Sequence, residues 1–355
     1  MDGILSLGHG TGSVSLYMAH GGTSFGFWNG ANGGGGASYQ PDITSYDYDS
    51  PLAEGGEHGY GSAGHDKYAA LSAVFAKHRP ANEPAPPAEP PLRARAAFGP
   101  VPLTERAALL DGLDVLTTAT RTGDAAPPAI ETLGCAYGFV VYEADVPADH
   151  AGMLTFPAVR DRVQVFAAGR YAGTAYRVTK QSGIPFDSGG VEAGTRLTLL
   201  VENMGRINFS RGGMADTRRG LLGNASAVLL DGKPLPVSYR GWSTRCLPLE
   251  PAQLAKLQWA PRGNDTSGPA FYRASFATPG GKAGLDTYLT LPGFTKGAAW
   301  VNGFALGRHW EAAGPQKTLY VPGPVVKGSG NELVVLELHN TSATGTAVFV
   351  DAADL

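Results

Sequence analysis

Cysteine is scarce in this chain of 355 residues, which carries only Cys135 and Cys246. One pair can form at most one disulfide, and it defines no disulfide framework. Free cysteines are among the most buried residue types in proteins. We therefore expect two buried thiols, with a single disulfide as the alternative.

Long apolar runs and basic runs are also missing. No apolar run reaches about 18 residues, so we expect no membrane span. The formal net charge is −3, and no Lys/Arg run interleaves with aromatic residues, which argues against a nucleic-acid partner. None of the eight histidines has the i, i+4 spacing of a metal site, and we predict neither a metal nor another cofactor.

Glycine and proline are abundant, with 50 and 26 copies. Together with few long helical patterns, they favour many short strands joined by turns. The length suggests two or three domains, and a hydrophobic content of 43% is enough for substantial cores.

The first unit covers residues 1–79 and has the order strand, long loop, helix. We predict a short buried strand at Val14–Ala19, followed by a Gly-, Tyr- and Asp-rich loop over 21–64. The stretch "DKYAALSAVFAKHR" then predicts a helix with Asp66 as its N-cap. Its side chains at helical spacing are Tyr68, Leu71, Phe75 and His78. One strand and one helix correspond to one step of a β/α barrel, not to a whole domain.

The clearest boundary is the proline-rich stretch 80–91, "PANEPAPPAEPP", which favours stiff, extended backbone. After it, short alternating strands with Gly-rich turns indicate antiparallel sandwiches. We predict a first β-sandwich at 92–240 and a second at 241–355, with approximate boundaries. The fold class is thus mainly β: two jelly-roll-like antiparallel β-sandwiches preceded by a remnant of a β/α barrel, comprising its last strand, a long loop and its last helix.

Two stretches resemble each other at a distance in the chain. "VRDRVQVFAAGRYAGT" and "KGAAWVNGFALGRHW" both show a strand, a turn with glycine, an aromatic residue and a further glycine. We predict that each forms a hairpin in the same position of two related sandwiches.

The loop contains tyrosines that suit sugar recognition, in "TSYDYDSPLAEGG". A tyrosine ring can cover the C–H face of a sugar while its hydroxyl bonds to sugar oxygens. The alternative is that these tyrosines pack the loop onto its own scaffold.

These motifs carry a family resemblance. "SLYMAHGGTSFGFWNGAN" and "YQPDITSYDYDSPLAEGG" closely resemble the end of the catalytic barrel in family 35 glycoside hydrolases, the β-galactosidases. "LGCAYGFVVYEADV", "LTLLVENMGRINF" and "GPAFYRASF" look like that family's two β-sandwich domains. The resemblance is collinear and covers almost the whole chain. One departure is Ser24, where the family usually has asparagine.

The resemblance implies a set of substrate-binding residues. In similar enzymes the equivalents of Tyr17, Tyr46 and Tyr48 lie around the galactose, and Tyr17 and Tyr48 are the better candidates. The adjacent Asp47 and Asp49 are expected to hold the loop through backbone hydrogen bonds. His20 is expected to have a supporting hydrogen-bonding role.

The resemblance also implies two catalytic glutamates at the ends of earlier barrel strands, because retaining glycosidases use two carboxyl groups about 5 Å apart. Neither sequence context occurs here. The pairs Asn82-Glu83 and Asn331-Glu332 lie in the linker and at the start of a sandwich strand. Catalysis by a pair among Asp47, Asp49, Glu54 and Glu57 is an unfavoured alternative. We therefore assign no catalytic residue and expect no glycosidase activity from this chain alone.

An incomplete barrel has structural consequences, because each barrel strand needs two hydrogen-bonded neighbours. We expect Val14–Ala19 to lie as an unsatisfied edge or to borrow support from the sandwiches. The helix face at Leu71 and Phe75 is expected to be partly exposed.

Two rival functions remain. The sandwiches could form a carbohydrate-binding module with Trp242, Trp300 and Trp310 as stacking platforms, although we expect Trp300 and Trp310 to fill the core. Alternatively, the chain could complement another chain that carries the rest of the barrel. The expected ligands are galactose-containing saccharides. The N-terminus has no recognisable signal peptide, while the resemblance points to relatives that are often secreted, periplasmic or lysosomal.

Overall fold

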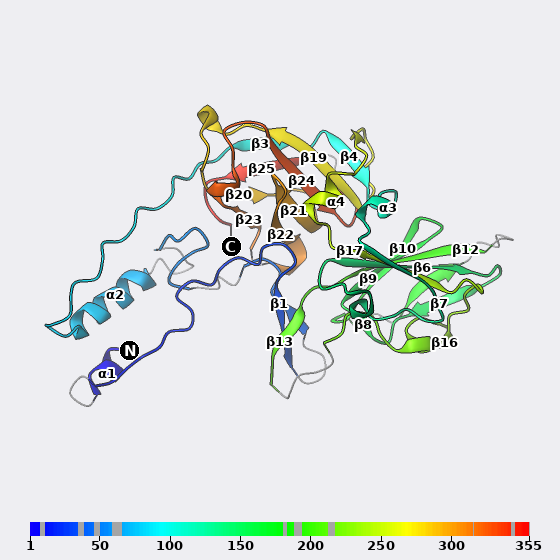
Figure 1. Ribbon diagram of the computed structural model, residues 1–355, viewed down its shortest axis with the longest axis horizontal. Helices are drawn as coiled ribbons and strands as arrows, with labels where there is room; N and C mark the ends of the chain where they lie inside the picture. Colours follow the sequence, from blue (N-terminus) through cyan, green and yellow to red (C-terminus); the bar gives the residue numbers. More distant parts are fainter. Residues whose placement is uncertain are drawn as a thin grey trace.

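The computed structural model describes residues 1–7, 11–34, 39–45, 50–58, 66–179, 183–187, 194–211, 217–314, 316–341 and 345–354. Two β-sandwiches form the body of the molecule, and an N-terminal arm projects from them (Figure 1). The predicted mainly β fold with two jelly-roll-like antiparallel sandwiches is confirmed.

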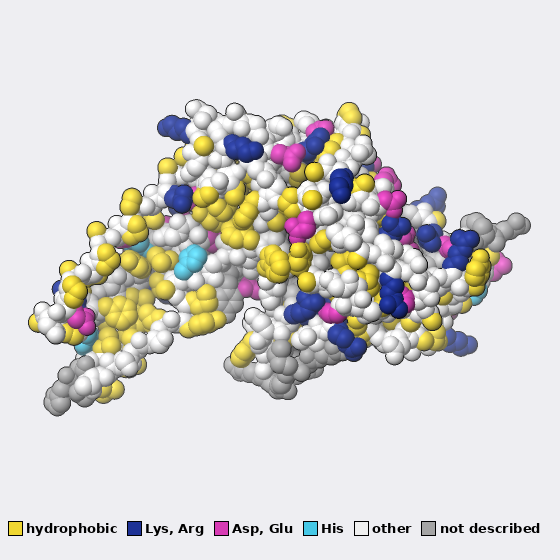
Figure 2. Space-filling model, in the orientation of Figure 1, with side chains coloured by type: hydrophobic (Ala, Val, Ile, Leu, Met, Phe, Trp, Pro, Cys, Tyr) yellow, Lys and Arg dark blue, Asp and Glu magenta, His cyan; other side chains and the backbone are white. Residues whose placement is uncertain are grey.

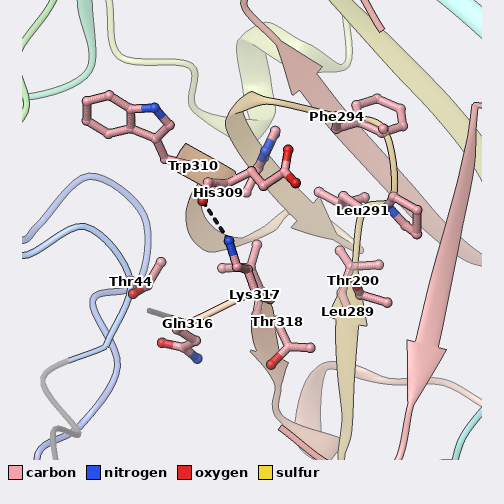
Figure 3. A pocket seen from close by; sticks show the side chains of 14 residues that line it. Thr44, Leu289, Thr290, Leu291, Phe294, His309, Trp310, Gln316, Lys317 and Thr318 are labelled. Carbon is pink, nitrogen blue, oxygen red and sulfur yellow. Dashed lines mark hydrogen bonds between the residues drawn. The ribbon is translucent and has the colours of Figure 1, made fainter. Parts of the chain in front are cut away.

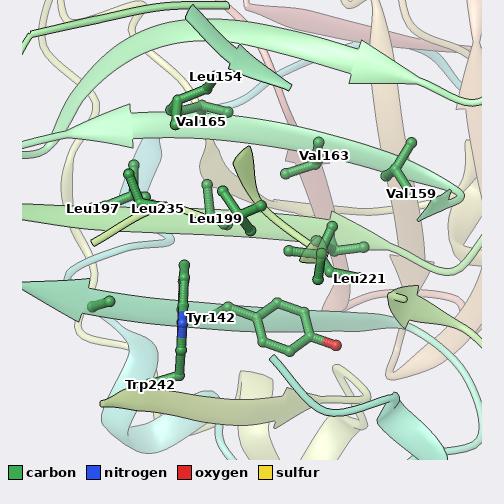
Figure 4. Packing of buried hydrophobic residues seen from close by; sticks show 14 of the residues in the cluster. Tyr142, Leu154, Val159, Val163, Val165, Leu197, Leu199, Leu221, Leu235 and Trp242 are labelled. Atoms are coloured by element: carbon green, nitrogen blue, oxygen red, sulfur yellow. The ribbon is translucent and has the colours of Figure 1, made fainter. Parts of the chain in front are cut away.

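The first sandwich packs a six-stranded sheet against a four-stranded one. The larger sheet has the order β10-β9-β12-β6-β17-β5 and the smaller β11-β7-β15-β16. Tyr142 and Trp242 lie in the core between them (Figure 4). The strands are β5 (Ala119–Asp124), β6 (Phe139–Val146), β7 (Ala151–Thr155), β9 (Arg162–Ala167), β10 (Arg170–Tyr176), β11 (Ile184–Asp187), β12 (Thr195–Glu202), β15 (Leu229–Leu230), β16 (Lys233–Pro234) and β17 (Trp242–Leu247).

The second sandwich repeats this plan. Its six-stranded sheet has the order β18-β4-β19-β24-β21-β22, and its four-stranded sheet the order β23-β20-β25-β3. The strands are β3 (Gly99–Pro102), β4 (Glu105–Ala108), β18 (Ala260–Pro261), β19 (Ala270–Phe276), β20 (Thr287–Thr290), β21 (Lys296–Val301), β22 (Phe304–Trp310), β23 (Thr318–Val321), β24 (Asn331–Glu337) and β25 (Thr346–Val350). Strands β3 and β4 precede the first sandwich in the chain yet pair within the second. The boundaries 92–240 and 241–355 stay a prediction.

Short elements complete the chain. A two-stranded sheet joins β14 to β8, and a three-stranded sheet has the order β13-β1-β2. Their bounds are β1 (Gly30–Gly34), β2 (Tyr39–Pro41), β8 (Val159–Arg160), β13 (Arg206–Arg211) and β14 (Gly220–Leu221). The helices are α1 (Asp2–Leu5), α2 (Lys67–His78), α3 (Leu113–Leu116) and α4 (Pro251–Leu254), with 3₁₀ turns at Ile130–Leu133, Asn224–Ser226, Pro279–Gly281, Glu311–Ala313 and Gly323–Val325.

The two six-stranded sheets pack against each other through their outer faces. In β6, Val140 and Tyr142 face the core of the first sandwich, while Phe139 and Val141 face the second sandwich. In β24, Val334 and Leu336 belong to the same shared core. Side chains alternate between the faces of a strand, so a strand buried on both faces needs a nearly continuous apolar run. The shared core explains the continuous apolar runs Phe139–Tyr142 in β6 and Leu333–Leu336 in β24.

Both predicted hairpins are confirmed. Strands β9 and β10 pair as one hairpin, and β21 and β22 as the other. Each hairpin lies at one end of its six-stranded sheet, where its first strand also pairs with a later long strand, β12 or β24. The two sandwiches therefore share this part of their topology, as the internal resemblance predicted.

The expectation of two free thiols is wrong, because Cys135 and Cys246 form a disulfide. Cys135 follows the 3₁₀ turn at Ile130–Leu133, and Cys246 lies in β17. Their Cα atoms are 6.0 Å apart, within the usual range for a disulfide, although 111 positions separate them in the chain. Sheet pairing places the two residues together, and spacing along the chain gives no sign of that.

Reducing this disulfide is expected to lower the free energy of unfolding by about 2–4 kcal/mol, because a long closed loop restricts the unfolded chain. Urea unfolding with and without dithiothreitol measures the difference. A Cys135→Ala/Cys246→Ala double variant serves as the control and should not respond to the reductant. Equal stability of the oxidised and reduced wild-type protein would contradict the expectation.

The arm contains α1, α2 and the proline-rich linker, and it extends away from both sandwiches (Figure 1). The predicted helix is confirmed at Lys67–His78, and the Asp66 side chain accepts a hydrogen bond from the Ala69 N–H, as expected of an N-cap. No residue of α2 is buried, and Phe75 is 42% exposed. Hydrophobic side chains gather along this arm (Figure 2). Among the described residues, no helix has the length and apolar character needed to span a membrane.

The predicted strand at Val14–Ala19 is wrong, because this stretch is irregular and Leu16 is 43% exposed. A strand needs a neighbour to receive its backbone hydrogen bonds. Among the described residues, the backbone bond found for this stretch joins the Leu52 N–H to the Ala19 carbonyl. Without a paired neighbour, apolar composition alone does not produce a strand here.

Candidate functional site

The N-terminal segment 20–58 is fixed to the sandwiches by buried aromatic side chains. Phe27 is 6% exposed and joins the core shared by the two six-stranded sheets. Its ring makes edge contacts with Phe139 at 5.8 Å and Trp300 at 6.3 Å between centroids. The Gly26 N–H also donates to the Ala305 carbonyl at 3.0 Å. Phe27 is therefore part of the hydrophobic core and ties this part of the segment to both sandwiches.

Asn29 connects the segment to a buried charged cluster. Its Nδ2 donates to the Met204 carbonyl at 2.8 Å, and its Oδ1 accepts from Arg308 Nη1. Arg308 also donates through Nε to Glu202 Oε1 at 3.0 Å. Lys296 Nζ donates to both carboxylate oxygens of Glu202, at 2.8 and 2.7 Å. Glu202, Lys296 and Arg308 are each at most 2% exposed.

One carboxylate thus faces several cations in a buried site. Burial raises the pKa of Glu202, but the charges of Lys296, Arg308 and Arg162 outweigh it and lower that pKa to about 2. Burial lowers the pKa of Lys296 to about 8, because Glu202 offsets only part of the desolvation and the two arginines oppose the charge. Glu202 therefore stays ionised among these cations, while the charge of Lys296 is only partly compensated.

A second buried cluster holds β2 against the first sandwich. The Tyr39 hydroxyl lies 3.0 Å from Asp161 Oδ2 and 2.7 Å from the Gly205 carbonyl oxygen, and its one proton is shared between these two acceptors. Arg177 lies 4.1 Å from the Tyr39 ring centroid and forms an ion pair with Asp161 at 2.7 Å. Burial, followed by the Asp161 charge, raises the pKa of Tyr39 well above its ordinary value. The neighbouring strand β1 pairs in parallel with β13, which attaches the segment to the sandwich through backbone hydrogen bonds.

Tyr17 lies on an open cavity beside this attachment. Its side chain is 86% exposed, and the cavity has a volume of about 560 Å³. The lining comes from four parts of the chain: Tyr17 and Met18, the segment 20–58, β13 and the turn after β22. The lining residues are Tyr17, Met18, Gly21, Gly30, Ala31, Asn32, Gln40, Pro41, Asp42, Asn208, Ala313 and Gly314. An exposed phenol beside amide side chains can both stack on a sugar and hydrogen-bond to it.

Tyr46 and Tyr48 lie outside the described residues, as do Asp47 and Asp49. Their positions relative to Tyr17 and their roles stay predictions. Ser24 is described: its N–H donates to the Thr44 carbonyl at 2.8 Å. A Cβ at Gly307 would lie 2.8 Å from the Ser24 carbonyl oxygen, so the loop backbone contacts β22 closely.

The described acids of the loop hold the loop in place. Glu54 accepts hydrogen bonds from Thr23 Oγ1 at 2.7 Å and from Gln316 Nε2 at 2.8 Å. Glu57 pairs with Arg95 at 2.7 Å and accepts from the Tyr288 hydroxyl at 3.0 Å. These contacts fix the loop on the second sandwich, which favours a structural role for both carboxylates.

His20 forms an isolated parallel bridge with Leu52 through its backbone. Within the described ranges, no group of three or more His, Cys, Asp or Glu side chains could hold a metal ion. Asn331 is fully buried at the start of β24, and Glu332 is 47% exposed in its side chain. The pair Asn331-Glu332 therefore belongs to a strand of the second sandwich.

A smaller cavity of about 320 Å³ lies beside β22 and β23 (Figure 3). Its lining includes Trp310, His309 and Lys317, and Lys317 Nζ donates to the Glu311 carbonyl at 2.7 Å. The Trp310 ring is covered by Lys296 Nζ at 4.5 Å and by Tyr176 at 5.6 Å between centroids. Trp300 and Trp242 are 1% and 3% exposed. Trp300 and Trp242 therefore fill cores, and packing against Lys296 and Tyr176 takes up much of the Trp310 ring.

Sequence reasoning missed the buried anchors of the segment. Phe27, Asn29 and Tyr39 lie among glycines, which concealed their burial. Glu202 and Arg308 carried a usable signal, since each is a charge inside or at the end of an otherwise apolar strand. Charged side chains are almost never fully buried unless paired, so such positions indicate a partner.

Three family models match successive parts of the chain. Residues 2–78 match "Glycosyl hydrolases family 35", residues 127–244 match "Beta-galactosidase, first all-beta domain", and residues 269–331 match "Beta-galactosidase, galactose-binding domain". The first match covers the arm and the anchored segment, and the others fall on the two sandwiches.

Curated relatives match over most of the chain. Beta-galactosidase 17 of Arabidopsis thaliana is 35% identical over 97% of this chain and 50% of its own length. The β-galactosidase of Homo sapiens is 36% identical over 92% of this chain and 47% of its own length. The chain thus spans about half the length of these relatives.

Among solved structures, a lectin from Pleurotus ostreatus in complex with GalNAc covers 71% of this chain and 79% of its own, at 12% identity and a TM-score of 0.20. That score is too low to support an argument. The family models and the curated relatives agree along the chain, which belongs to glycosyl hydrolase family 35, with its matched regions in the order expected for the C-terminal portion of a β-galactosidase.

Proposed function

We propose that this chain contributes one wall of the galactose site and the two supporting sandwiches of a retaining β-galactosidase, and that it does not hydrolyse β-galactosides alone. Family membership supports the substrate class, terminal β-linked galactose. The observation that carries the proposal is the 86% exposed side chain of Tyr17 on its open cavity. Tyr46 and Tyr48 are proposed to complete this wall.

The chemistry of a retaining glycosidase supports the second half of the proposal. One carboxylic acid must protonate the leaving oxygen while a carboxylate about 5–5.5 Å away attacks the anomeric carbon. Glu54 and Glu57 already accept hydrogen bonds that hold the loop. Neither is therefore well placed to serve as acid or nucleophile.

A chromogenic β-galactoside assay on the purified chain tests the proposal. The expected result is no turnover above a heat-treated sample, with a complete β-galactosidase as the positive control under the same conditions. Turnover that a Tyr17→Ala variant reduces would contradict the proposed inactivity and would support the site. Turnover that Tyr17→Ala leaves unchanged would contradict both the proposed inactivity and the proposed role of Tyr17.

The exposed arm favours a complementing role. Helix α2 presents Leu71 and Phe75 without burying either, and α1 exposes Ile4 to 48%. Exposed apolar surface of this kind marks a contact site or a liability. A chain that carries the remaining barrel strands would cover this face, and mixing the two chains should then restore turnover.

A further inference from the structure

A shallow cleft is formed by the N-terminal segment just before β1, by the start of β22 and by the residues that follow β17. Its volume is about 240 Å³, and it shares no lining residue with the Tyr17 cavity. Its lining combines the segment with both sandwiches and includes Phe25, Trp28, Tyr137, Glu250, Phe304 and Ala305. Typical ligand pockets measure about 300–1,000 Å³, so this cleft suits one residue of a longer ligand better than a buried molecule.

Trp28 is the most unusual residue of the cleft. The residue is 73% exposed, yet its ring centroid is 4.5 Å from that of Tyr137. Gly26 has φ +60°, and a Cβ there would lie 3.2 Å from Trp28 Cδ1, so the backbone closely supports the indole. A large apolar ring held in a defined position in water is characteristic of a binding surface.

The aromatic rings are paired and do not surround a common point. Trp28 and Tyr137 pack at an interplanar angle of 46°, and Phe25 and Phe304 meet edge to face with centroids 5.0 Å apart. A cation site would need several ring faces directed at one centre. Here each ring covers part of the ring it is paired with. The part of Trp28 that stays exposed can contact a flat ligand.

A carboxylate lies beside this surface. The Tyr137 hydroxyl donates to Glu250 Oε1, and this hydrogen bond raises the pKa of Tyr137 to about 12, which keeps the phenol protonated. Among the described residues, the side-chain hydrogen bond found for Glu250 uses its Oε1 atom. An ionised carboxylate oxygen is a strong acceptor for hydroxyl groups.

We propose that this cleft is a non-catalytic binding site for a neutral saccharide, with Trp28 against the C–H face of one sugar ring and Glu250 Oε2 accepting from its hydroxyl groups. A flat aromatic surface beside an acceptor matches the two kinds of surface that a sugar presents. The negative charge of Glu250 disfavours acidic saccharides. The proposal does not depend on hydrolysis and is tested by binding alone.

Isothermal titration calorimetry of the full chain with β-1,4-galactotetraose provides the test. Trp28→Ala is expected to weaken binding at least about tenfold, and Trp28→Phe, which keeps an aromatic face, less than about threefold. Glu250→Gln is expected to weaken it at least about threefold. Tyr239→Ala, at a residue that is 95% exposed away from the cleft, is the matched control and should bind like the wild type.

Three results would overturn the proposal. The first is absence of binding by the wild-type chain. The second is binding that Tyr17→Ala abolishes and Trp28→Ala leaves intact, which would assign the saccharide to the Tyr17 cavity. The third is binding of tetramethylammonium, but not of the saccharide, that is lost in Trp28→Ala, which would identify a cation site.

Discussion

Replacing Glu202 by glutamine is expected to lower the free energy of unfolding by about 3–5 kcal/mol at neutral pH. Glutamine keeps the shape of the side chain but removes the charge that compensates Lys296 and Arg308. Both cations are 1% exposed. Water can therefore hydrate them only if the junction between the sandwiches opens. Urea unfolding of the two proteins, compared at equal m-value, measures the change.

Glu332→Gln is the matched control. Glu332 lies in β24 with a 47% exposed side chain, and its oxygen is 3.6 Å from Arg273. An exposed pair of this kind contributes less than about 1 kcal/mol. If Glu202→Gln lowers the free energy of unfolding by no more than Glu332→Gln does, the buried cluster does not stabilise the junction between the sandwiches.

The pH dependence of stability provides an internal check on this prediction. The pKa of Glu202 is lowered from 4.5 to about 2, so its contribution is present above pH 4.5 and is lost as the pH falls toward about 2. Lys296, Arg308 and Arg162 face this carboxylate, with Glu337, His309 and His339 nearby. The difference between wild type and Glu202→Gln should therefore shrink over this range. A difference that stays constant would mean that ionisation of Glu202 is not the cause.

Replacing Phe27 by alanine is expected to lower the free energy of unfolding by about 3–5 kcal/mol, because it removes a ring from the core shared by the two six-stranded sheets and leaves a cavity. Phe27 contacts Phe139 of the first sandwich and Trp300 of the second, and Arg308 lies 4.7 Å from its ring centroid. The loss should therefore affect both sandwiches. Urea unfolding measures the cost, and faster hydrogen exchange at the Gly26 N–H would report release of the segment.

Phe75→Ala provides the comparison for this variant. Phe75 is 42% exposed on α2, which buries no residue, so its removal should change stability by less than about 0.5 kcal/mol. Similar effects of the two substitutions would show that the segment is not part of the core.

Local signals in the sequence predicted local structure correctly. The N-cap at Asp66 and the two Gly-containing hairpins depend on neighbours within a few positions, and the structure has them. The strand predicted at Val14–Ala19 failed because pairing depends on distant partners. The disulfide between Cys135 and Cys246 and the parallel pairing of β1 with β13 depend equally on topology.

The candidate site was only partly accessible to sequence reasoning. Tyr17 followed from a family resemblance, and its role in binding stays a prediction. Burial of Asn29 and Tyr39 could not be predicted, because polar residues among glycines are usually solvated. The buried partners Arg308 and Asp161, together with the Met204 and Gly205 carbonyls, explain why these two side chains are buried.

The early position of β3 and β4 also limits how the polypeptide can be dissected. These strands occupy residues 99–108, ahead of the first sandwich, but they complete both sheets of the second. Cutting the chain near residue 240 would separate the second sandwich from β3, an edge strand of its four-stranded sheet, and from β4, an interior strand of its six-stranded sheet. It would also expose the hydrophobic core that the two sandwiches share. Because the second sandwich is built from residues on both sides of the first, a deletion, duplication or fusion would have to keep residues 99–350 together.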